Sequence, residues 1–213
     1  MNNTIEPRRR PAQERSKKRV DAILNAAKSL ITEKGCARLK IHDIASRADV
    51  TPASIYQYFP NKNAITMALA EATFGATYEI LAESLPVMSS KQEMYQVLRG
   101  LVEQYYQAYL NDPAMLDVWV SISADKSMHE FDLQDSRRTA DLIYQCMKQF
   151  YPESQWERIS KTSFLLAHLS GSAVRMALSV GPEEGRALMD AFLSLISPTS
   201  LDDVLGYKQK SQK

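Results

Sequence analysis

The fold is decided by the stretch TPASIYQYFPNK, residues 51–62. Thr51 is a favoured N-cap residue and Pro52 a favoured first residue of a helix, so a helix is predicted to begin here. Pro60 ends that helix after about two turns because proline lacks the backbone donor that a helix needs. A helix this short, with aromatic residues but no continuous apolar stripe, is a poor core element. Its outer side chains are therefore predicted to contact a partner.

Two side chains of this stretch are expected to face inward. Ile55 and Phe59 are four residues apart, so they share one helix face and can anchor it on its neighbours. The others suit a nucleic-acid surface, because Gln57 can pair with an adenine edge and tyrosine hydroxyls reach phosphate oxygens. About two turns of helix also fit usefully in a major groove. The candidate DNA contacts in this stretch are Thr51, Ala53, Ser54, Tyr56, Gln57, Tyr58 and Lys62.

Two further helices are predicted before this one. Apolar residues recur at three and four from about Ser16, which indicates an amphipathic helix that ends at Gly35. A second short helix fits residues 41–48, and Asp49 stands where a left-handed turn residue is expected. The order predicts a three-helix helix–turn–helix unit; the alternative interpretation is a small helical hairpin with surface tyrosines.

Charge is distributed unevenly along the chain. Residues 1–62 hold thirteen Lys and Arg against six Asp and Glu, a net charge of +7, whereas residues 63–213 carry a net charge of −6. This asymmetry suggests that the first part meets a polyanion. Residues 1–14 are expected to form a disordered basic arm that adds salt-dependent affinity for DNA; the alternative is a solubilising tail. The basic residues of this arm and of the residues that directly follow it are Arg8, Arg9, Arg10, Arg15, Lys17, Lys18 and Arg19.

Residues 16 to about 66 resemble the DNA-binding domain of the tetracycline-repressor (TetR) family. The resemblance is carried by Asp43-Ile44-Ala45, Val50-Thr51 and residues 55–62, in that order and spacing. It implies a homodimeric transcriptional regulator, and by family precedent a repressor, that binds a pseudo-palindromic operator in double-stranded DNA. A small organic effector bound in the C-terminal domain would then release the DNA.

The resemblance also implies roles for single residues. Ser54 and Gln57 would face bases, and His42 would contact a base or the backbone. The phosphate contacts it implies are Tyr56, Tyr58 and Lys62. Three positions depart from the family pattern: Lys40 replaces the usual Ser or Thr cap of the second helix, Asp49 replaces the usual turn glycine, and Asn63 replaces a common acidic residue, which slightly favours anion binding at that helix start. Lys40 is also a candidate DNA contact.

Helical periodicity continues through the remaining two thirds of the chain. A long helix over residues 61–81 is expected to join the two halves and transmit a conformational change. Further helices are predicted over residues 95–109, 115–120, 129–150 and 154–180, and a last one after Gly181. We therefore expect an all-α chain with an arm over 1–14, a DNA-binding domain over 15–62, a ligand-binding and dimerisation domain over 63–197, and a C-terminal tail over 198–213.

The last two long helices are predicted to form a dimer interface. Small and apolar residues cover more than one face of the helix over 154–180, so it needs partners on two sides. A second subunit would supply one of them in a two-fold, four-helix interface; the alternative is a central core helix of a monomer. The candidate interface residues are Leu169, Gly171, Ala173, Val174, Ala177, Leu188, Phe192 and Leu195.

A ligand pocket is expected between the middle helices. Aromatic residues and methionines with a few polar groups suit a mostly apolar organic molecule. The alternative is ordinary core, and for His168 a satisfied buried histidine. The candidate pocket residues are Tyr105, Tyr109, Met115, Trp119, Tyr144, Met147, His168 and Met176.

Sequence motifs give no support for catalysis. The three histidines lie in separate segments without metal-ligand spacing, and there is no glycine-rich phosphate loop or nucleophile elbow. We therefore expect no metal, no cofactor and no enzyme. Cys36 and Cys146 form no CxxC, and no apolar run is long enough to span a membrane, so a cytoplasmic protein is expected. The alternatives are a constitutive DNA-binding protein without an effector and, less favoured, a small helical enzyme.

Overall fold

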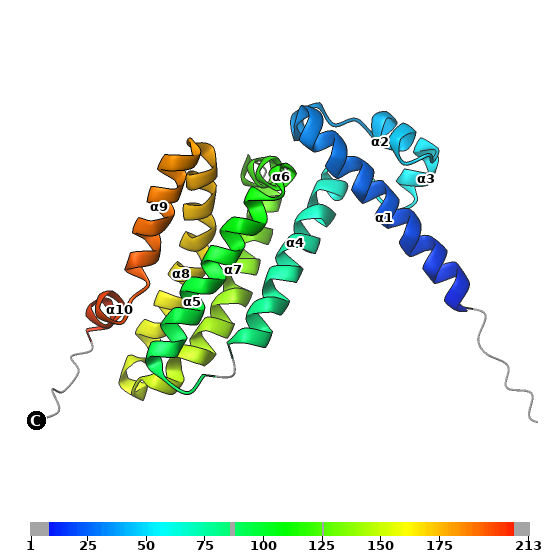
Figure 1. Cartoon of the computed structure of the whole chain (residues 1–213). Helices are drawn as coiled ribbons and strands as arrows, with labels where there is room; N and C mark the ends of the chain where they lie inside the picture. Colours follow the sequence, from blue (N-terminus) through cyan, green and yellow to red (C-terminus); the bar gives the residue numbers. More distant parts are fainter. Residues whose placement is uncertain (1–8, 86–87, 125, 207–213) are drawn as a thin grey trace, which may run out of the picture.

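The computed structural model describes residues 9–85, 88–124 and 126–206. Within these ranges the chain is helical, with short 3-10 turns and no strand. A small group of N-terminal helices stands at one end of a larger helical bundle, and one helix runs from the first group along the second (Figure 1). This arrangement confirms the all-α prediction.

The N-terminal group consists of α1 (Arg9–Lys34), α2 (Ile41–Arg47) and α3 (Pro52–Tyr56). Gly35 follows α1 with φ 79°, a left-handed conformation that glycine adopts without steric cost. A 3-10 turn, η1 (Cys36–Arg38), then leads to α2. The reversal between α2 and α3 contains Asp49 at φ 53°, as the sequence predicted.

The predicted caps of the DNA-binding unit are present. The Thr51 side chain accepts a hydrogen bond from the backbone N–H of Ser54 at 3.2 Å, and Pro52 opens α3. Asn61 caps the next helix by accepting from the N–H of Ala64 at 2.9 Å. Lys40 precedes α2 without a side-chain cap bond, which agrees with its unusual residue type at that position.

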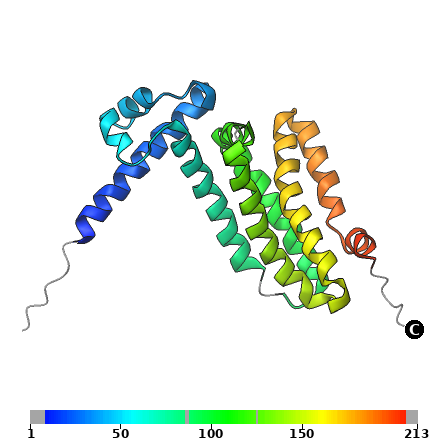
Figure 2. The same ribbon diagram turned by 180° about the vertical axis from the view of Figure 1, so that it is seen from behind.

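The bundle is built from long helices. They are α4 (Lys62–Ser84), α5 (Lys91–Leu110), α6 (Pro113–Ala124), α7 (Lys126–Met147), α8 (Trp156–Ser179) and α9 (Pro182–Leu195), followed by the short α10 (Pro198–Leu205). The 3-10 turns η2 (Lys148–Phe150) and η3 (Glu153–Gln155) connect α7 to α8. Helix α5 lies in front of α7 and α8 in Figure 1 and behind them in Figure 2, so the bundle has two layers.

Two expectations about the ends of the chain were wrong where the structure describes them. Helix α1 begins at Arg9, so residues 9–14 are helical rather than part of a disordered arm. Residues 1–8 lie outside the described ranges. The segment after residue 197, expected to be a tail, begins with α10, whose Leu201 and Leu205 are buried against the bundle.

One hydrophobic cluster runs through both parts of the molecule. It includes Ile23, Ile44 and Ile55 from the DNA-binding helices and continues through α4 to Trp119 of α6 and Met189 of α9. A second cluster fills the far end of the bundle. Helix α6 contacts α1, η1, α4 and α7, so it packs against both the DNA-binding unit and the bundle. The two parts are therefore mechanically connected through packed side chains.

Candidate functional site

Helix α3 has one buried face and one open face. Ile55 is fully buried and Phe59 nearly so, which confirms them as the anchors of this helix. The opposite face carries Tyr56 at 56% exposure, with Gln57 exposed beside it. The other predicted DNA contacts that are exposed are Lys40, His42, Thr51, Ala53 and Lys62. A polar and aromatic surface on a short, well-anchored helix is the geometry that major-groove reading needs.

Two of the predicted contacts are held in place by neighbours. The hydroxyl of half-buried Tyr58 accepts a hydrogen bond from the Ser16 hydroxyl at 3.4 Å. The Lys62 ammonium group donates to the backbone carbonyl of Ala37 at 3.5 Å, which ties the start of α4 to η1. Ser54 is half-buried, so its hydroxyl lies at the edge of the open face rather than at its centre.

Other basic residues of this unit form ion pairs with carboxylates. Arg47 donates to both carboxylate oxygens of Glu33, at 2.7 and 2.9 Å, and this hydrogen bonding lowers the pKa of Glu33. Lys34 pairs with Asp43 and lowers the pKa of that carboxyl in the same way. These pairs join α1 to α2.

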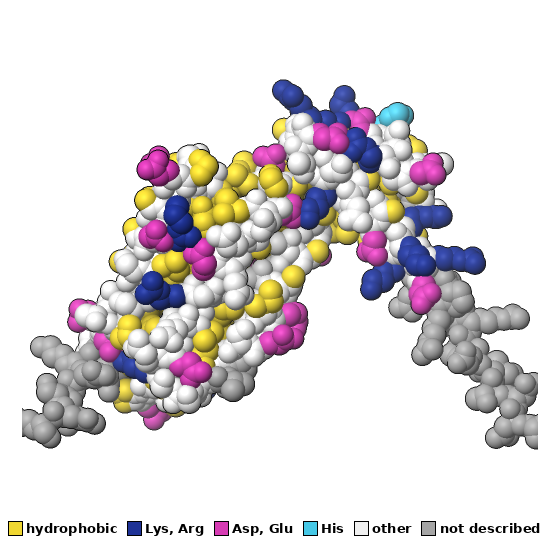
Figure 3. Space-filling model, viewed as in Figure 1, with side chains coloured by type: hydrophobic (Ala, Val, Ile, Leu, Met, Phe, Trp, Pro, Cys, Tyr) yellow, Lys and Arg dark blue, Asp and Glu magenta, His cyan; other side chains and the backbone are white. Residues whose placement is uncertain are grey.

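The positive charge that remains exposed lies elsewhere on the DNA-binding unit. It is carried by Arg15, Lys17, Lys18 and Arg19 on α1, by Arg38 of η1, by Lys40 directly before α2 and by Lys62 at the start of α4. Basic side chains gather over α1 and the neighbouring end of the molecule in Figure 3.

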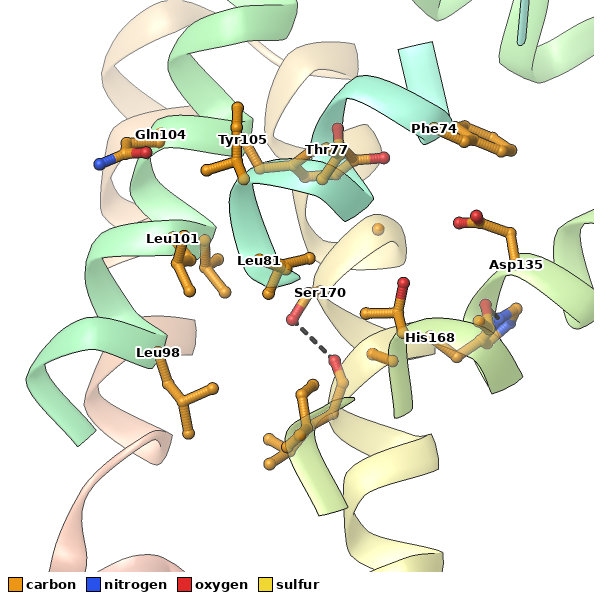
Figure 4. A pocket seen from close by; sticks show the side chains of 18 of the residues that line it. Phe74, Thr77, Leu81, Leu98, Leu101, Gln104, Tyr105, Asp135, His168 and Ser170 are labelled. Carbon is orange, nitrogen blue, oxygen red and sulfur yellow. Dashed lines mark hydrogen bonds between the residues drawn. The ribbon is translucent and has the colours of Figure 1, made fainter. Parts of the chain in front are cut away.

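A cavity of about 140 Å³ lies inside the bundle. Its wall is formed by α4, α5, α6, α7 and α8 together with the residue after α9, and it is largely apolar. Figure 4 shows side chains of α4, α5, α7 and α8 pointing toward this space. The residues that line it are Phe74, Thr77, Ile80, Leu81, Leu98, Leu101, Val102, Gln104, Tyr105, Ala108, Trp119, Asp132, Asp135, Ser136, Thr139, Ile143, Leu166, Ala167, His168, Ser170, Gly171 and Ile196.

The polar side of the cavity is acidic. Asp132 and Asp135 both project from α7, and burial raises the pKa of Asp135 to about 6, with a further contribution from Asp132. His168 on α8 faces Asp132 with 3.8 Å between Nδ1 and Oδ2, and the same nitrogen is 3.1 Å from the Ser136 hydroxyl. This group can position a ligand that carries hydrogen-bond donors or positive charge.

An arginine stands behind the cavity wall. The guanidinium of Arg175 lies 3.4 Å from the centre of the Trp119 ring and donates to the Ser172 hydroxyl at 2.7 Å. Burial lowers the pKa of this guanidinium and raises the pKa of the neighbouring Tyr105 and Tyr109, whose hydroxyls are 3.1 Å apart. Arg175 is thus outside the cavity lining, stacked on Trp119 and with its Nη1 next to Gly171 of the wall.

The structure brings three of the eight predicted pocket residues to the cavity. Tyr105, Trp119 and His168 line it, so His168 is not merely an enclosed core residue. The other five do not line the cavity, because their positions on the helices direct their side chains into the core or toward solvent. Tyr109, Met115 and Met147 are buried in the hydrophobic clusters, Tyr144 packs against the second cluster, and Met176 is 61% exposed.

Sequence reasoning missed the acidic side of the cavity. Asp132, Asp135, Ser136 and Thr139 occupy positions i, i+3, i+4 and i+7, which places them on one face of α7. A polar stripe at helical spacing on a helix that also carries core residues was the available signal. It was overlooked because polar stripes usually face water.

Family comparisons match both parts of this architecture. The description "Bacterial regulatory proteins, tetR family" matches residues 23–69, and "Tetracyclin repressor-like, C-terminal domain" matches residues 92–197. The chain belongs to the TetR family. The resemblance seen in the DNA-binding stretch therefore extends over the bundle.

Individual relatives of this TetR-family chain are distant. A curated relative, the uncharacterized HTH-type transcriptional regulator YvdT of Bacillus subtilis strain 168, is 30% identical over 86 residues, which is 40% of this chain and 43% of that protein. The match thus spans less than half the length of that relative.

Solved structures share the fold over most of their length. A TetR-family transcriptional regulator from Pectobacterium atrosepticum has a TM-score of 0.63 at 13% identity, covering 86% of this chain and 92% of that one. The regulator FadR from Bacillus subtilis, solved in complex with stearoyl-CoA, has a TM-score of 0.64 at 16% identity, covering 83% and 97%. At these identities the likeness shows the fold alone.

An apolar face of this TetR-family bundle is open. Leu165, Leu169 and Met176 lie along one side of α8 at 57%, 47% and 61% exposure, and Leu195 of α9 is 59% exposed. Hydrophobic side chains are visible on the bundle surface in Figure 3. The four exposed side chains define what we call the apolar face.

The apolar face differs from the predicted interface in its members. Leu169 and Leu195 are exposed, and their place in an interface stays a prediction. Val174 and Ala177 are buried within the monomer, Gly171 lines the cavity, and Ala173, Leu188 and Phe192 are half-buried against the core. The helix over 154–180 therefore buries one face inside its own subunit and leaves a different one open.

The described residues contain neither a membrane-spanning helix nor a group of side chains arranged as a metal site. Residues 9–85, 88–124 and 126–206 contain no helix long and apolar enough to cross a membrane. The same part of the chain holds no group of three or more His, Cys, Asp or Glu side chains arranged to hold a metal ion.

Proposed function

We propose that this protein is a homodimeric transcriptional repressor that binds a pseudo-palindromic DNA operator and is released by a small organic effector. The observation that carries the proposal is that α3 has one buried face and one exposed face. Ile55 and Phe59 fix it on the protein, while Tyr56 and Gln57 are exposed on the opposite side. A helix presented in this way can enter a major groove with its backbone position already determined.

The contacts to DNA divide into two groups by chemistry. Gln57 and Ser54 are assigned to base edges, because an amide can pair bidentately with adenine and a hydroxyl can bond to several base edges. Tyr56, Tyr58 and Lys62 are assigned to phosphates, with Lys40, His42, Thr51 and Ala53 at the rim of the same surface. Arg15, Lys17 and Lys18 supply the positive charge that makes binding dependent on salt.

Dimerisation through the apolar face supports this role. A cluster of large exposed apolar side chains marks an interaction site, and a two-fold axis would place the same face of two subunits together. Such a dimer carries two copies of α3, which a pseudo-palindromic operator with half-sites about one helical turn apart requires. A regulator that reads chromosomal DNA would act in the bacterial cytoplasm.

Helix α6 offers a route from effector to DNA. Trp119 lines the cavity, and two residues earlier on the same helix Asp117 lies against Gly35, at the end of α1. Lys28 of α1 pairs with Asp112, directly before α6. A ligand that displaces Trp119 would therefore shift α6 against α1. If it binds one arrangement of the two parts more tightly than the other, it shifts the population toward that arrangement.

The FadR complex shows that a neighbour with this fold can hold an organic ligand, stearoyl-CoA in that protein. We assign an effector to the cavity of the present chain on its own geometry, because a concave, mostly apolar space with a few convergent polar groups is the usual form of a small-molecule site.

Selection from a pool of random duplexes tests the function without assuming which gene is controlled. Purified protein is used to enrich bound duplexes over several rounds, and the pool is sequenced. The proposal predicts an enriched motif with two related half-sites in inverted orientation. A pool that stays random, although the protein binds DNA, would show that the protein does not read sequence.

A further inference from the structure

The charged groups that line the cavity decide which ligands it can accept. Asp132 and Asp135 contribute carboxylates, and among the described residues no Lys or Arg reaches the lining. The other titratable side chains that the structure describes in the wall are His168 and Tyr105. A ligand that enters this space therefore meets an excess of negative charge once both aspartates are ionised.

Asp132 has basic groups close to it. The imidazole of His168 lies 3.8 Å from its carboxylate, and the positive charge of Arg175 also acts on it. Only 8% of the Asp132 side chain is exposed. Asp132 is thus a structural member of the wall, and its charge is partly compensated within the protein.

Asp135 is in a different position. Among the described residues it has no hydrogen bond and no ion pair, and the only basic group that acts on it is Arg138, one turn along the same helix. The Arg138 guanidinium is turned away toward α4, where it lies 3.4 Å from the centre of the Tyr78 ring and 4.0 Å from the carboxylate of Glu79. The carboxylate of Asp135 points into the space between Phe74 and His168 in Figure 4.

The surface facing this carboxylate is aromatic. Phe74 and Trp119 line the cavity with ring centres 6.0 Å apart, and Tyr105 lies in the same wall. Aromatic faces attract cations through their quadrupole, and the attraction grows when water is excluded. An anionic group in the same place would be repelled by two carboxylates, and a neutral ligand would leave the Asp135 charge buried without a partner.

We propose that the effector of this cavity is an organic cation, an amine or similar base with an aromatic or alkyl body, whose positive group binds the Asp135 carboxylate. The proposal rests on the proposed function, because it takes the cavity to be the effector site. The apolar body would lie against Leu81, Leu98 and Leu101, and the cationic group would lie between Asp135 and the aromatic wall.

Arg175 does not offer an anionic ligand an equivalent anchor. Its guanidinium lies behind Trp119, is not part of the cavity lining, and already donates to Ser172. The geometry of the resting cavity therefore favours positive over negative ligands.

The test uses matched probes that differ only in charge. These are the ω-phenylalkylamines with chains of two to six carbons, the alcohols of the same length, and the corresponding carboxylic acids. Binding to the full chain is measured by calorimetry and by the shift in Tm, without DNA. We expect at least one amine to bind about tenfold or more tightly than its alcohol, and every acid to bind more weakly than either.

Two conservative variants locate the effect. Asp135→Asn should abolish the preference for amine over alcohol, because the amide keeps the shape but removes the charge. Asp141→Asn, on the exposed side of the same helix, should leave the preference unchanged. Amine affinity of the wild type should also fall as the pH is lowered through about 6, where the carboxylate of Asp135 takes up a proton and loses its charge.

Three results would overturn the proposal: no amine binding better than its alcohol, an acid binding best, or an amine preference that survives Asp135→Asn. These outcomes are separate from those of the operator selection, which uses DNA and no ligand. An enriched operator with no amine preference would support the proposed regulator and contradict only the cationic effector. An amine preference without an enriched operator would support the cationic ligand and contradict the proposed regulator.

Discussion

Lys28 of α1 and Asp112, the residue before α6, form an ion pair across the junction between the DNA-binding unit and the bundle. The two side chains are 43% and 24% exposed, so the pair is screened by solvent and contributes modestly to stability. Its position matters more than its strength. It links the helix that carries the DNA-binding unit to the helix that carries Trp119 of the cavity.

Exchanging these charges tests the link. Lys28→Asp and Asp112→Lys should each lower the free energy of unfolding by up to about 1 kcal/mol and weaken operator binding, because like charges would face each other. The double variant should recover most of both losses. Thermal denaturation and operator titration of all four proteins measure the coupling. A double variant no better than the sum of the single ones would show that the pair does not connect the two parts.

Substitutions of Gln57 and Lys62 are predicted to affect DNA binding in different ways. Gln57→Ala should cost about 1–3 kcal/mol on the preferred operator and relax base preference at one position in each half-site. Lys62→Ala should weaken binding to all sequences almost equally and reduce the dependence on salt concentration by about one charge. Titrations with the operator and with single-base variants at several salt concentrations separate the two effects. Equal losses of specificity from both substitutions would mean that the assigned roles are wrong.

The apolar face is predicted to hold the dimer together. Leu169→Glu combined with Leu195→Glu places charge on two exposed members of this face, so it should convert a dimer to a monomer without unfolding it. Operator affinity should then fall because each half-site is bound alone. Leu110→Glu is a matched control, since Leu110 is 44% exposed at the end of α5 and outside the apolar face.

Sedimentation of the three proteins shows the outcome directly. The account expects a dimer for the wild type and the control and a monomer for the double variant. A dimer that persists in the double variant would place the interface elsewhere.

Asp135 should make stability depend on pH in an unusual direction for a carboxyl. Its pKa is raised from 3.8 to about 6 in the folded protein, mainly by burial, so folding favours the protonated form. The corresponding stability is present below pH 4 and is lost as the pH rises through 6. At pH 8 the native state must hold an ionised, partly buried carboxylate.

Removing that charge should therefore stabilise the protein most at high pH. Asp135→Asn is expected to raise the free energy of unfolding by about 1 kcal/mol at pH 8, allowing for solvent screening, or about 2–4 °C in Tm. The gain should fall to about half at pH 5, which lies between the pKa of the unfolded chain and that of the folded protein. Differential scanning calorimetry of variant and wild type at both values checks this, because the titration of all other groups cancels in the difference. A gain that is equal at both pH values would contradict the raised pKa.

Local signals predicted the DNA-binding unit well. Thr51-Pro52 and Asn61 cap helices as expected, Gly35 ends α1 with positive φ, and Asp49 takes the left-handed conformation at the turn. Each of these depends on residues within a few positions along the chain, which is why sequence alone was sufficient.

The same signals were present where prediction failed. Residues 1–14 were expected to be a disordered arm, but Pro11 lies in the first turn of α1, where a proline costs no hydrogen bond. Ser197-Pro198 repeats the pattern of Thr51-Pro52 and starts α10, with the Ser197 hydroxyl accepting from the Ser200 N–H. Both errors concern a helix start with a proline in its first turn, near an end of the chain.

The cavity could not be derived in the same way. Met147 and Tyr105 look alike as apolar residues on predicted helices, yet one is enclosed in the core and the other faces the cavity. Which side chains border a void depends on how five helices fit together, and helical spacing carries no information about that gap. The open apolar face likewise depends on which sides of α8 are covered within the subunit.

One titration tests the central claim most directly. A fluorescently labelled duplex carrying the selected operator is compared by anisotropy with a duplex of equal length and composition in which both half-sites are scrambled, at low and at physiological salt. The account predicts tighter binding to the operator at both salt concentrations, with a preference that persists as non-specific binding weakens. Equal binding to the two duplexes, lost together as salt rises, would show that the basic surface contacts phosphate alone and that α3 does not read DNA sequence.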